Sequence, residues 1–173
     1  MGLTFQVGNA AHVFIEPYGL NLDRALRENF PGQISVFPEE EAAYSRELGW
    51  SGWEGLQEAA VVALGNAALP QLLSMPAWKG VYLPVDVAPC SLSDIPGEDS
   101  PLAVGALDGL VVELENFGKI AGLPTDDVGL ELLAEKYDDD DLCDDDMETQ
   151  TYAQLLLVGH LAQRGRYPLW IVK

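Results

Sequence analysis

The chain ends in an apolar stretch, Tyr167–Lys173 (YPLWIVK), which follows a long segment with apolar residues at helical spacing. A short apolar run bounded by turn residues is typical of a buried strand. Leaving this strand exposed to water would be unfavourable, because its large apolar side chains would lose the free energy of burial. We therefore expect the last strand to return into a sheet formed by earlier parts of the chain.

Three earlier segments also predict strands. Residues 3–17 (LTFQVGNAAHVFIEP) resemble two extended arms around Gly8-Asn9, a dipeptide that suits the tight turn of a hairpin. Gln33–Phe37 predicts a short strand, and Val81–Val87 predicts another, which Pro84 interrupts. Because proline cannot donate to a sheet ladder, we expect that strand to lie at an edge or to carry a bulge.

Helical signals fill most of the chain between these strands. The clearest helix has Ser100 as N-cap and Pro101 as its first residue, and it stops at Gly122. In another, the acids Glu39–Glu41 lie in the first turn, where helix electrostatics alone explains them. The predicted helices cover residues 21–30, 38–49, 54–68, 101–121, 125–137 and 147–164.

Strands at the start, middle and end of the chain, with five or six helices between them, predict an α+β fold. We expect a single domain over residues 1–173, with a small mixed or antiparallel sheet that the helices cover. Hydrophobic residues make up 48% of the sequence, which excludes a mainly disordered chain despite its charge.

The sequence favours neither a membrane nor an oxidising compartment. The longest apolar candidate, Ala59–Pro70, is shorter than the roughly 18–20 residues of a membrane span. The N-terminal residues lack the charged start and apolar core of a signal peptide. The two cysteines, Cys90 and Cys143, lie far apart and form no paired motif. We therefore expect a reduced, cytoplasmic protein.

The formal net charge is −19, from 28 acidic and nine basic residues. The excess is uneven, because residues 1–80 hold nine acids and four bases while residues 81–173 hold nineteen and five. A field of this sign repels nucleic acid and anionic membranes, and it attracts basic protein surfaces or cationic ligands. We expect no nucleic-acid or membrane partner.

The densest acidic run is Asp138–Glu148, in which eight of the eleven residues are carboxylates. Neither register of an EF-hand loop fits, because no glycine is available for its sharp turn. Looser binding of Ca²⁺ or Mg²⁺ by clustered carboxylates stays open, with Asp138 and Asp140 as weak candidate ligands. No other cofactor is expected.

Helix electrostatics explains only half of this run. Asp144, Asp145 and Asp146 come just before the last predicted helix, where negative charge is favourable. Asp138–Asp141 follow the C-terminal end of the preceding helix, where negative charge is unfavourable. We therefore predict that the run binds a basic protein surface, although a solvated linker remains an alternative. The predicted binding residues are Asp138, Asp139, Asp140, Asp141, Asp144, Asp145 and Asp146.

A metal-assisted hydrolase or small-molecule-binding protein is the second hypothesis. Its cleft would hold a histidine and carboxylates, but no spacing in the sequence brings such residues together. Zinc is unfavoured because two histidines and two scattered cysteines barely supply four ligands. No phosphate-binding loop or G-x-S-x-G motif occurs. The candidate residues are His12, His160, Asp86, Asp94 and Glu113.

Two tryptophans, Trp50 and Trp53, lie three residues apart among glycines in a predicted connector. Exposed tryptophans in a loop are typical anchors of protein interfaces. The commoner alternative is that they cover the core beside the following helix.

Overall fold

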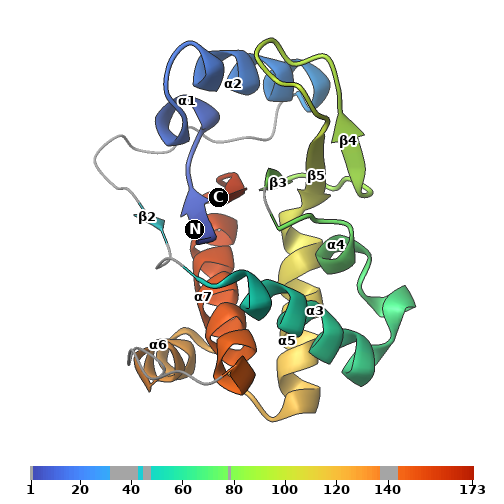
Figure 1. The fold of residues 1–173 in the computed structure, drawn as a ribbon, viewed down its shortest axis with the longest axis vertical. Helices are drawn as coiled ribbons and strands as arrows, with labels where there is room; N and C mark the ends of the chain where they lie inside the picture. Colours follow the sequence, from blue (N-terminus) through green and yellow to red (C-terminus); the bar gives the residue numbers. More distant parts are fainter. Residues whose placement is uncertain (1, 32–42, 45–47, 78, 137–143) are drawn as a thin grey trace.

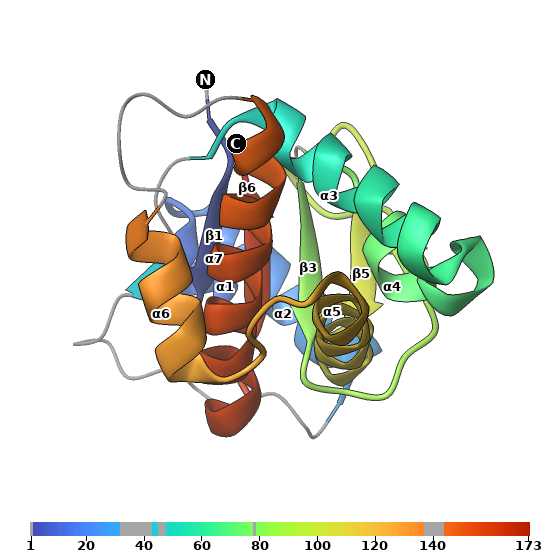
Figure 2. The same ribbon diagram turned by 90° about the horizontal axis from the view of Figure 1, so that it is seen from below.

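The computed structural model of the protein describes residues 2–31, 43–44, 48–77, 79–136 and 144–173. Its strands are β1 (Thr4–Val7), β2 (Ala43–Tyr44), β3 (Lys79–Leu83), β4 (Cys90–Leu92), β5 (Leu102–Ala106) and β6 (Leu169–Val172). They form one mixed, six-stranded sheet in the order β2-β1-β6-β3-β5-β4. Figure 1 shows the whole chain, and Figure 2 shows β1, β6, β3 and β5 side by side. β3 and β5 pair parallel, and the other neighbouring strands are antiparallel.

Helices cover both faces of the sheet, as the view from below in Figure 2 shows, which confirms the predicted α+β class. One face carries α1 (Ala10–Val13) and α2 (Tyr18–Asn29). The other carries α3 (Trp50–Leu64), α5 (Leu107–Ala121) and α7 (Asp144–Gly165), and α6 (Asp127–Lys136) packs against α7. A 3-10 turn (Asn66–Ala68) and α4 (Pro70–Leu73) connect α3 to β3.

The prediction for the C-terminal strand is confirmed. β6 lies in the middle of the sheet, antiparallel to both β1 and β3. Leu169 and Ile171 point into the core beneath α3, α5 and α7, and Trp170 points to the opposite face. All three side chains are fully buried. The last residues of the chain therefore join both layers of helices to the sheet.

The predicted N-terminal hairpin is wrong. Only its first arm is a strand, and the residues after Gly8 form the short helix α1. Strand β1 pairs instead with β6 and β2, which lie far away in the sequence. The Gly8-Asn9 turn signal is local, and pairing with the buried β6 outweighs it because strand preference depends mainly on tertiary neighbours.

The long helix predicted from Pro101 begins later than expected. Residues Leu102–Ala106 form β5, which pairs parallel with β3, and α5 starts only at Leu107. Helical spacing hid this strand because its residues are apolar on both faces, as parallel strands usually are. The predicted end is confirmed, since Gly122 ends the helix in the left-handed conformation with a φ of 70°.

Other predicted boundaries also change. β3 is a central strand that ends before Pro84, so the proline neither marks an edge nor interrupts the ladder. The edge strand β4, before Ser100, is a further strand that the sequence did not predict. The predicted strand Gln33–Phe37 lies outside the described residues. The helix predicted over residues 38–49 is wrong at Ala43–Tyr44, which form β2.

The glycine-rich stretch around Trp50 and Trp53 is not a connector but the start of α3. A Cβ atom on Gly52 would lie 2.4 Å from Thr151 Oγ1 and 2.7 Å from the backbone oxygen of Met147. The glycine is therefore needed for the close packing of α3 against α7. In the sequence, a glycine with this role looks the same as a glycine that marks a turn. No helix among the described residues is long and apolar enough to cross a membrane.

Candidate functional site

The acidic run is divided between residues that the structure describes and residues that it does not. Asp138–Asp141 lie outside the described residues, so their role in binding a partner, and that of Asp138 and Asp140 in binding a metal, stays a prediction. Asp144, Asp145 and Asp146 form the first residues of α7 rather than a segment before it. The run therefore leads directly into α7.

The first turns of α7 line a groove of about 380 Å³ between α3 and α5. Leu56 of α3 and Phe117 of α5 are buried in its floor. Ala and Leu side chains form most of the remaining wall, and Glu148 and Thr149 come from α7. The groove is thus apolar along its length, and it carries a carboxylate where α7 begins.

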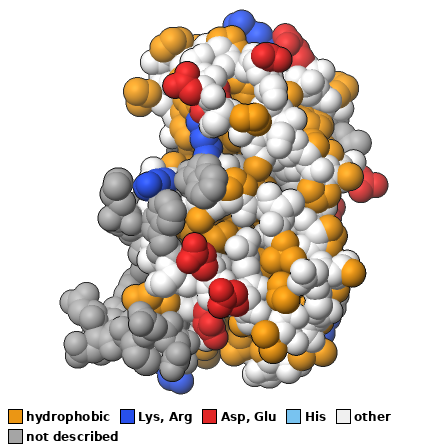
Figure 3. Space-filling model, turned by 45° about the vertical axis from the view of Figure 1, so that its right-hand side comes forward, with side chains coloured by type: hydrophobic (Ala, Val, Ile, Leu, Met, Phe, Trp, Pro, Cys, Tyr) orange, Lys and Arg blue, Asp and Glu red, His pale blue; other side chains and the backbone are white. Residues whose placement is uncertain are grey.

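Two large apolar side chains stand exposed in this groove. Val62 on α3 is 89% exposed, and Ile120 on α5 is 64% exposed. Apolar side chains gathered on one exposed face, with polar residues around them, are typical of an interaction site. Figure 3 shows one face of the molecule, on which hydrophobic side chains are spread over the upper and lower parts, with acidic side chains among them.

Glu148 is held against α3 because Gly55 has no side chain there. A Cβ atom on Gly55 would lie 3.2 Å from Glu148 Oε2 and 3.3 Å from Glu148 Cβ. This close approach places the Glu148 carboxylate beside the apolar groove. Asp144–Asp146 precede it in the same helix, within about 6 Å along the helix axis at 1.5 Å per residue. Negative charge therefore lies next to exposed apolar surface.

The tryptophans do not form an exposed anchor pair. Trp53 is only 1% exposed, and its ring packs against Phe5 with 5.9 Å between the centroids. It belongs to the core beneath α3, as the alternative interpretation expected. The side chain of Trp50 lies outside what the structure describes, so no role is assigned to it.

The candidate residues of the hydrolase hypothesis do not form one cleft. His12 lies in α1 and His160 in α7, on opposite faces of the sheet. Glu113 is buried and accepts hydrogen bonds from the backbone N–H groups of α4. Asp86 and Asp94 are exposed on either side of β4. Among the described residues, no group of three or more His, Cys, Asp and Glu side chains is placed to hold a metal ion.

His160 instead connects three helices through two carboxylates that the sequence did not single out as its partners. Its Nδ1 lies 2.7 Å from Asp127 Oδ1 on α6, and its Nε2 lies 3.3 Å from Glu115 Oε1 on α5. Arg164 also donates to Asp127 Oδ2 at 2.6 Å. These partners are 33 to 45 residues away along the chain, so no local spacing reveals them. The cluster fastens α6 to α7.

We expect Asp127→Asn to destabilise the protein in a pH-dependent way. Partial burial acts to raise the pKa of Asp127, but hydrogen bonds from His160 and Arg164 outweigh it and lower this pKa. The carboxylate therefore stabilises the fold above its unfolded pKa, about 3.9, and this contribution is lost as pH falls through the folded pKa. Since the side chain is about a third exposed, we expect a loss of roughly 0.5–1 kcal/mol at neutral pH.

Urea unfolding of Asp127→Asn and the wild type, at about pH 7 and about pH 3, measures this effect. Glu131→Gln, a charge change on the exposed side of α6, is the matched control. The difference between Asp127→Asn and the wild type should shrink at the lower pH. An equal difference at both pH values would show that the carboxylate charge does not stabilise this cluster.

The chain matches no protein-family model, and comparison with curated proteins and with solved structures found no match either.

Proposed function

We propose that this protein is a non-enzymatic, acidic cytoplasmic protein that binds a basic, amphipathic segment of a partner protein. The binding site is the groove between α3, α5 and the start of α7. The observation that carries this proposal is the position of the groove, because exposed apolar side chains lie beside the helix end where the acidic run enters.

The apolar part of the site favours a helical segment. A helix binds such a groove by placing apolar residues at spacings of three and four along one face. Val62 and Ile120 come from two different helices and border the same groove, so one inserted face contacts both. Burying these exposed side chains would supply most of the affinity, since a few central apolar contacts dominate most interfaces.

The charge of the molecule favours a basic segment. A net charge of −19 speeds the association of a cationic partner and repels an anionic one. The net charge of −19 already counts all nine basic residues, and several of those in the described residues are paired with acids within the protein. The pairs are Arg27–Asp23, Lys79–Glu98 and Arg164–Asp127.

Such a site suits a protein that covers the cationic surface of another protein. Small acidic inhibitor or immunity proteins neutralise nucleases in this way, and the analogy here rests on charge and size alone. In this proposal Asp138–Asp141 and Asp144–Asp146 attract the partner, and Glu148 pairs with a cation at the end of the groove. The apolar groove then fixes the bound segment.

A synthetic peptide of leucine and lysine, about 18 residues or five helical turns long, tests this proposal. Its leucines recur at spacings of three and four residues, and a fluorescent label reports binding by anisotropy. We expect the double variant Val62→Ser/Ile120→Ser to bind this peptide at least roughly tenfold more weakly, because it loses the apolar contacts. Binding should also weaken between about 50 mM and about 500 mM NaCl, since salt screens the acids.

The matched control is Val128→Ser/Leu132→Ser, which removes an apolar pair from α6 that is 67% and 63% exposed. This pair lies outside the groove, so its loss should leave binding unchanged. A second control is a peptide of the same composition with its leucines scattered around the helix. Equal binding of both peptides, or equal losses in both double variants, would mean that charge alone attracts the peptide and that the groove has no part.

A further inference from the structure

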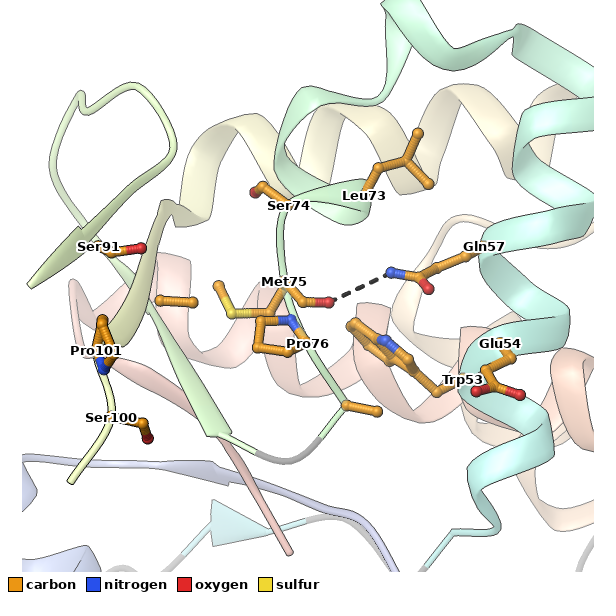
Figure 4. Close-up of a pocket in the computed structure, with 12 residues that line it drawn as sticks. Trp53, Glu54, Gln57, Leu73, Ser74, Met75, Pro76, Ser91, Ser100 and Pro101 are labelled. Carbon is orange, nitrogen blue, oxygen red and sulfur yellow. Dashed lines mark hydrogen bonds between the residues drawn. The ribbon is translucent and has the colours of Figure 1, made fainter. Parts of the chain in front are cut away.

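A second pocket, of about 570 Å³, lies between the first half of α3 and the β4–β5 edge of the sheet. Figure 4 shows Trp53 and Gln57 extending from α3 toward Met75 and Pro76, with Ser91 and Ser100 on the opposite side. This volume lies within the range of roughly 300–1,000 Å³ that is usual for small-molecule sites. The pocket uses a different side of α3 from the groove described above.

The wall of this pocket contains a buried hydrogen-bond donor without an acceptor. Trp53 is 1% exposed, and its Nε1 has no hydrogen-bond partner among the described residues. Buried N–H groups in folded proteins almost always have a partner, so each exception needs an explanation. The other fully buried indole, Trp170, donates to the backbone oxygen of Gly8 at 2.9 Å. The indole N–H of Trp53 is therefore a buried donor, in a residue that lines this pocket, for which the described residues supply no acceptor.

The other residues that line the pocket indicate which chemical groups a ligand would carry. Met75, Pro76 and Pro101 supply apolar surface, and Ser91 and Ser100 supply hydroxyl groups. Glu54 lines the pocket and is exposed, so its carboxylate faces solvent where a ligand enters. No lysine or arginine lines the pocket among the described residues. The polar groups thus comprise one buried donor, hydroxyls, the Gln57 amide and one negative charge.

We propose that this pocket binds a small organic cation that also carries a carbonyl oxygen. The carbonyl oxygen accepts the hydrogen bond from Trp53 Nε1, and the ammonium group faces the Glu54 carboxylate. The apolar body of the ligand packs against Met75, Pro76 and Pro101. Amino-acid amides and the N-terminal residues of peptides have this chemistry. The acidic field of the whole protein concentrates such cations near the pocket.

The indole N–H of Trp53 gives its own signal in a proton–nitrogen NMR spectrum, so binding at this group can be observed directly. The probe is L-phenylalanine amide, and its matched anion is N-acetyl-L-phenylalanine, which keeps the ring and a carbonyl oxygen. The Trp53 indole signal is identified by its loss in Trp53→Phe. We expect the amide to move this signal in a saturable way and the anion to leave it in place.

Two variants on the exposed rim test the same site without disturbing the core. Ser100→Trp should fill the pocket and weaken amide binding at least roughly tenfold, whereas Ser93→Trp, in the same loop but outside the pocket, should not. Glu54→Gln should weaken binding severalfold, and Glu58→Gln, one turn further along α3 and outside the pocket, should not. The proposal would be overturned if about 10 mM amide did not move the indole signal, or if the anion moved it equally. It would also be overturned if Ser100→Trp and Glu54→Gln both bound the amide as the wild type does.

Discussion

Trp170→Ala should lower the free energy of unfolding by about 3–5 kcal/mol, the usual loss when a fully buried tryptophan is truncated. Trp170 is 0% exposed in a central strand. Its ring meets Phe14 edge to face with 5.0 Å between the centroids, and its Nε1 donates to the backbone oxygen of Gly8 at 2.9 Å. The substitution removes both contacts and leaves a cavity between the sheet and α1.

Urea unfolding of the variant and the wild type measures this loss, and Trp170→Phe separates its parts. Phenylalanine keeps an aromatic ring but has no N–H group, so we expect it to lose less than alanine does. The hydrogen bond to Gly8 accounts for about 1 kcal/mol of that smaller loss. A loss below about 1 kcal/mol for Trp170→Ala would mean that the C-terminal strand does not join the two layers as described.

Glu113→Ala should cost about 2–4 kcal/mol, because it leaves two buried donors without an acceptor. The Glu113 carboxylate accepts hydrogen bonds from the backbone N–H groups of Gln71 and Leu72, both at 2.8 Å. These donors lie at the start of α4, where a helix has no internal acceptors for its N–H groups. Gln71 in turn accepts from the backbone N–H of Ala106 at 2.8 Å. The carboxylate therefore holds α4 against the junction of β5 and α5.

Thermal and urea unfolding measure this loss, with Glu131→Ala on the exposed side of α6 as the matched control. Burial raises the pKa of Glu113 despite the two opposing backbone hydrogen bonds. Because this pKa is raised, the contribution of Glu113 to stability is greatest below the unfolded value of about 4.3, and it falls as pH rises through the folded value. Glu113→Gln, which keeps one acceptor oxygen, should lack this dependence. A loss in Glu113→Ala no larger than in the control would contradict the capping role.

The sequence predicted those elements whose signals are local. Gly122 ends α5 because a left-handed residue there satisfies the helix end, and the apolar C-terminal run returns into the sheet. β5 was missed because its small apolar residues have no period of their own, and its strand character comes from pairing with β3. The N-terminal hairpin was wrong for the same reason, since distant strands compete with a local turn for β1.

The candidate site was predictable only in its charge. The acidic run and the helix that follows it are evident in the sequence, but the groove is formed by three helices that meet through packing. Val62 and Ile120 look like ordinary core residues at helical spacing, and only the structure shows that they are exposed. Gly55 falls within a predicted helix, and the sequence does not show that it allows Glu148 to lie against α3.

An NMR titration of the ¹⁵N-labelled protein with the leucine–lysine peptide locates binding most directly. We expect backbone signals to change along the groove, in residues 56–63 of α3, residues 117–123 at the end of α5 and just beyond it, and residues 148–149 of α7. Signals of β4, β5 and the outer side of α6 should stay in place. Changes that gather on α6 or spread evenly over the acidic surface, with the groove signals unmoved, would contradict the proposed site.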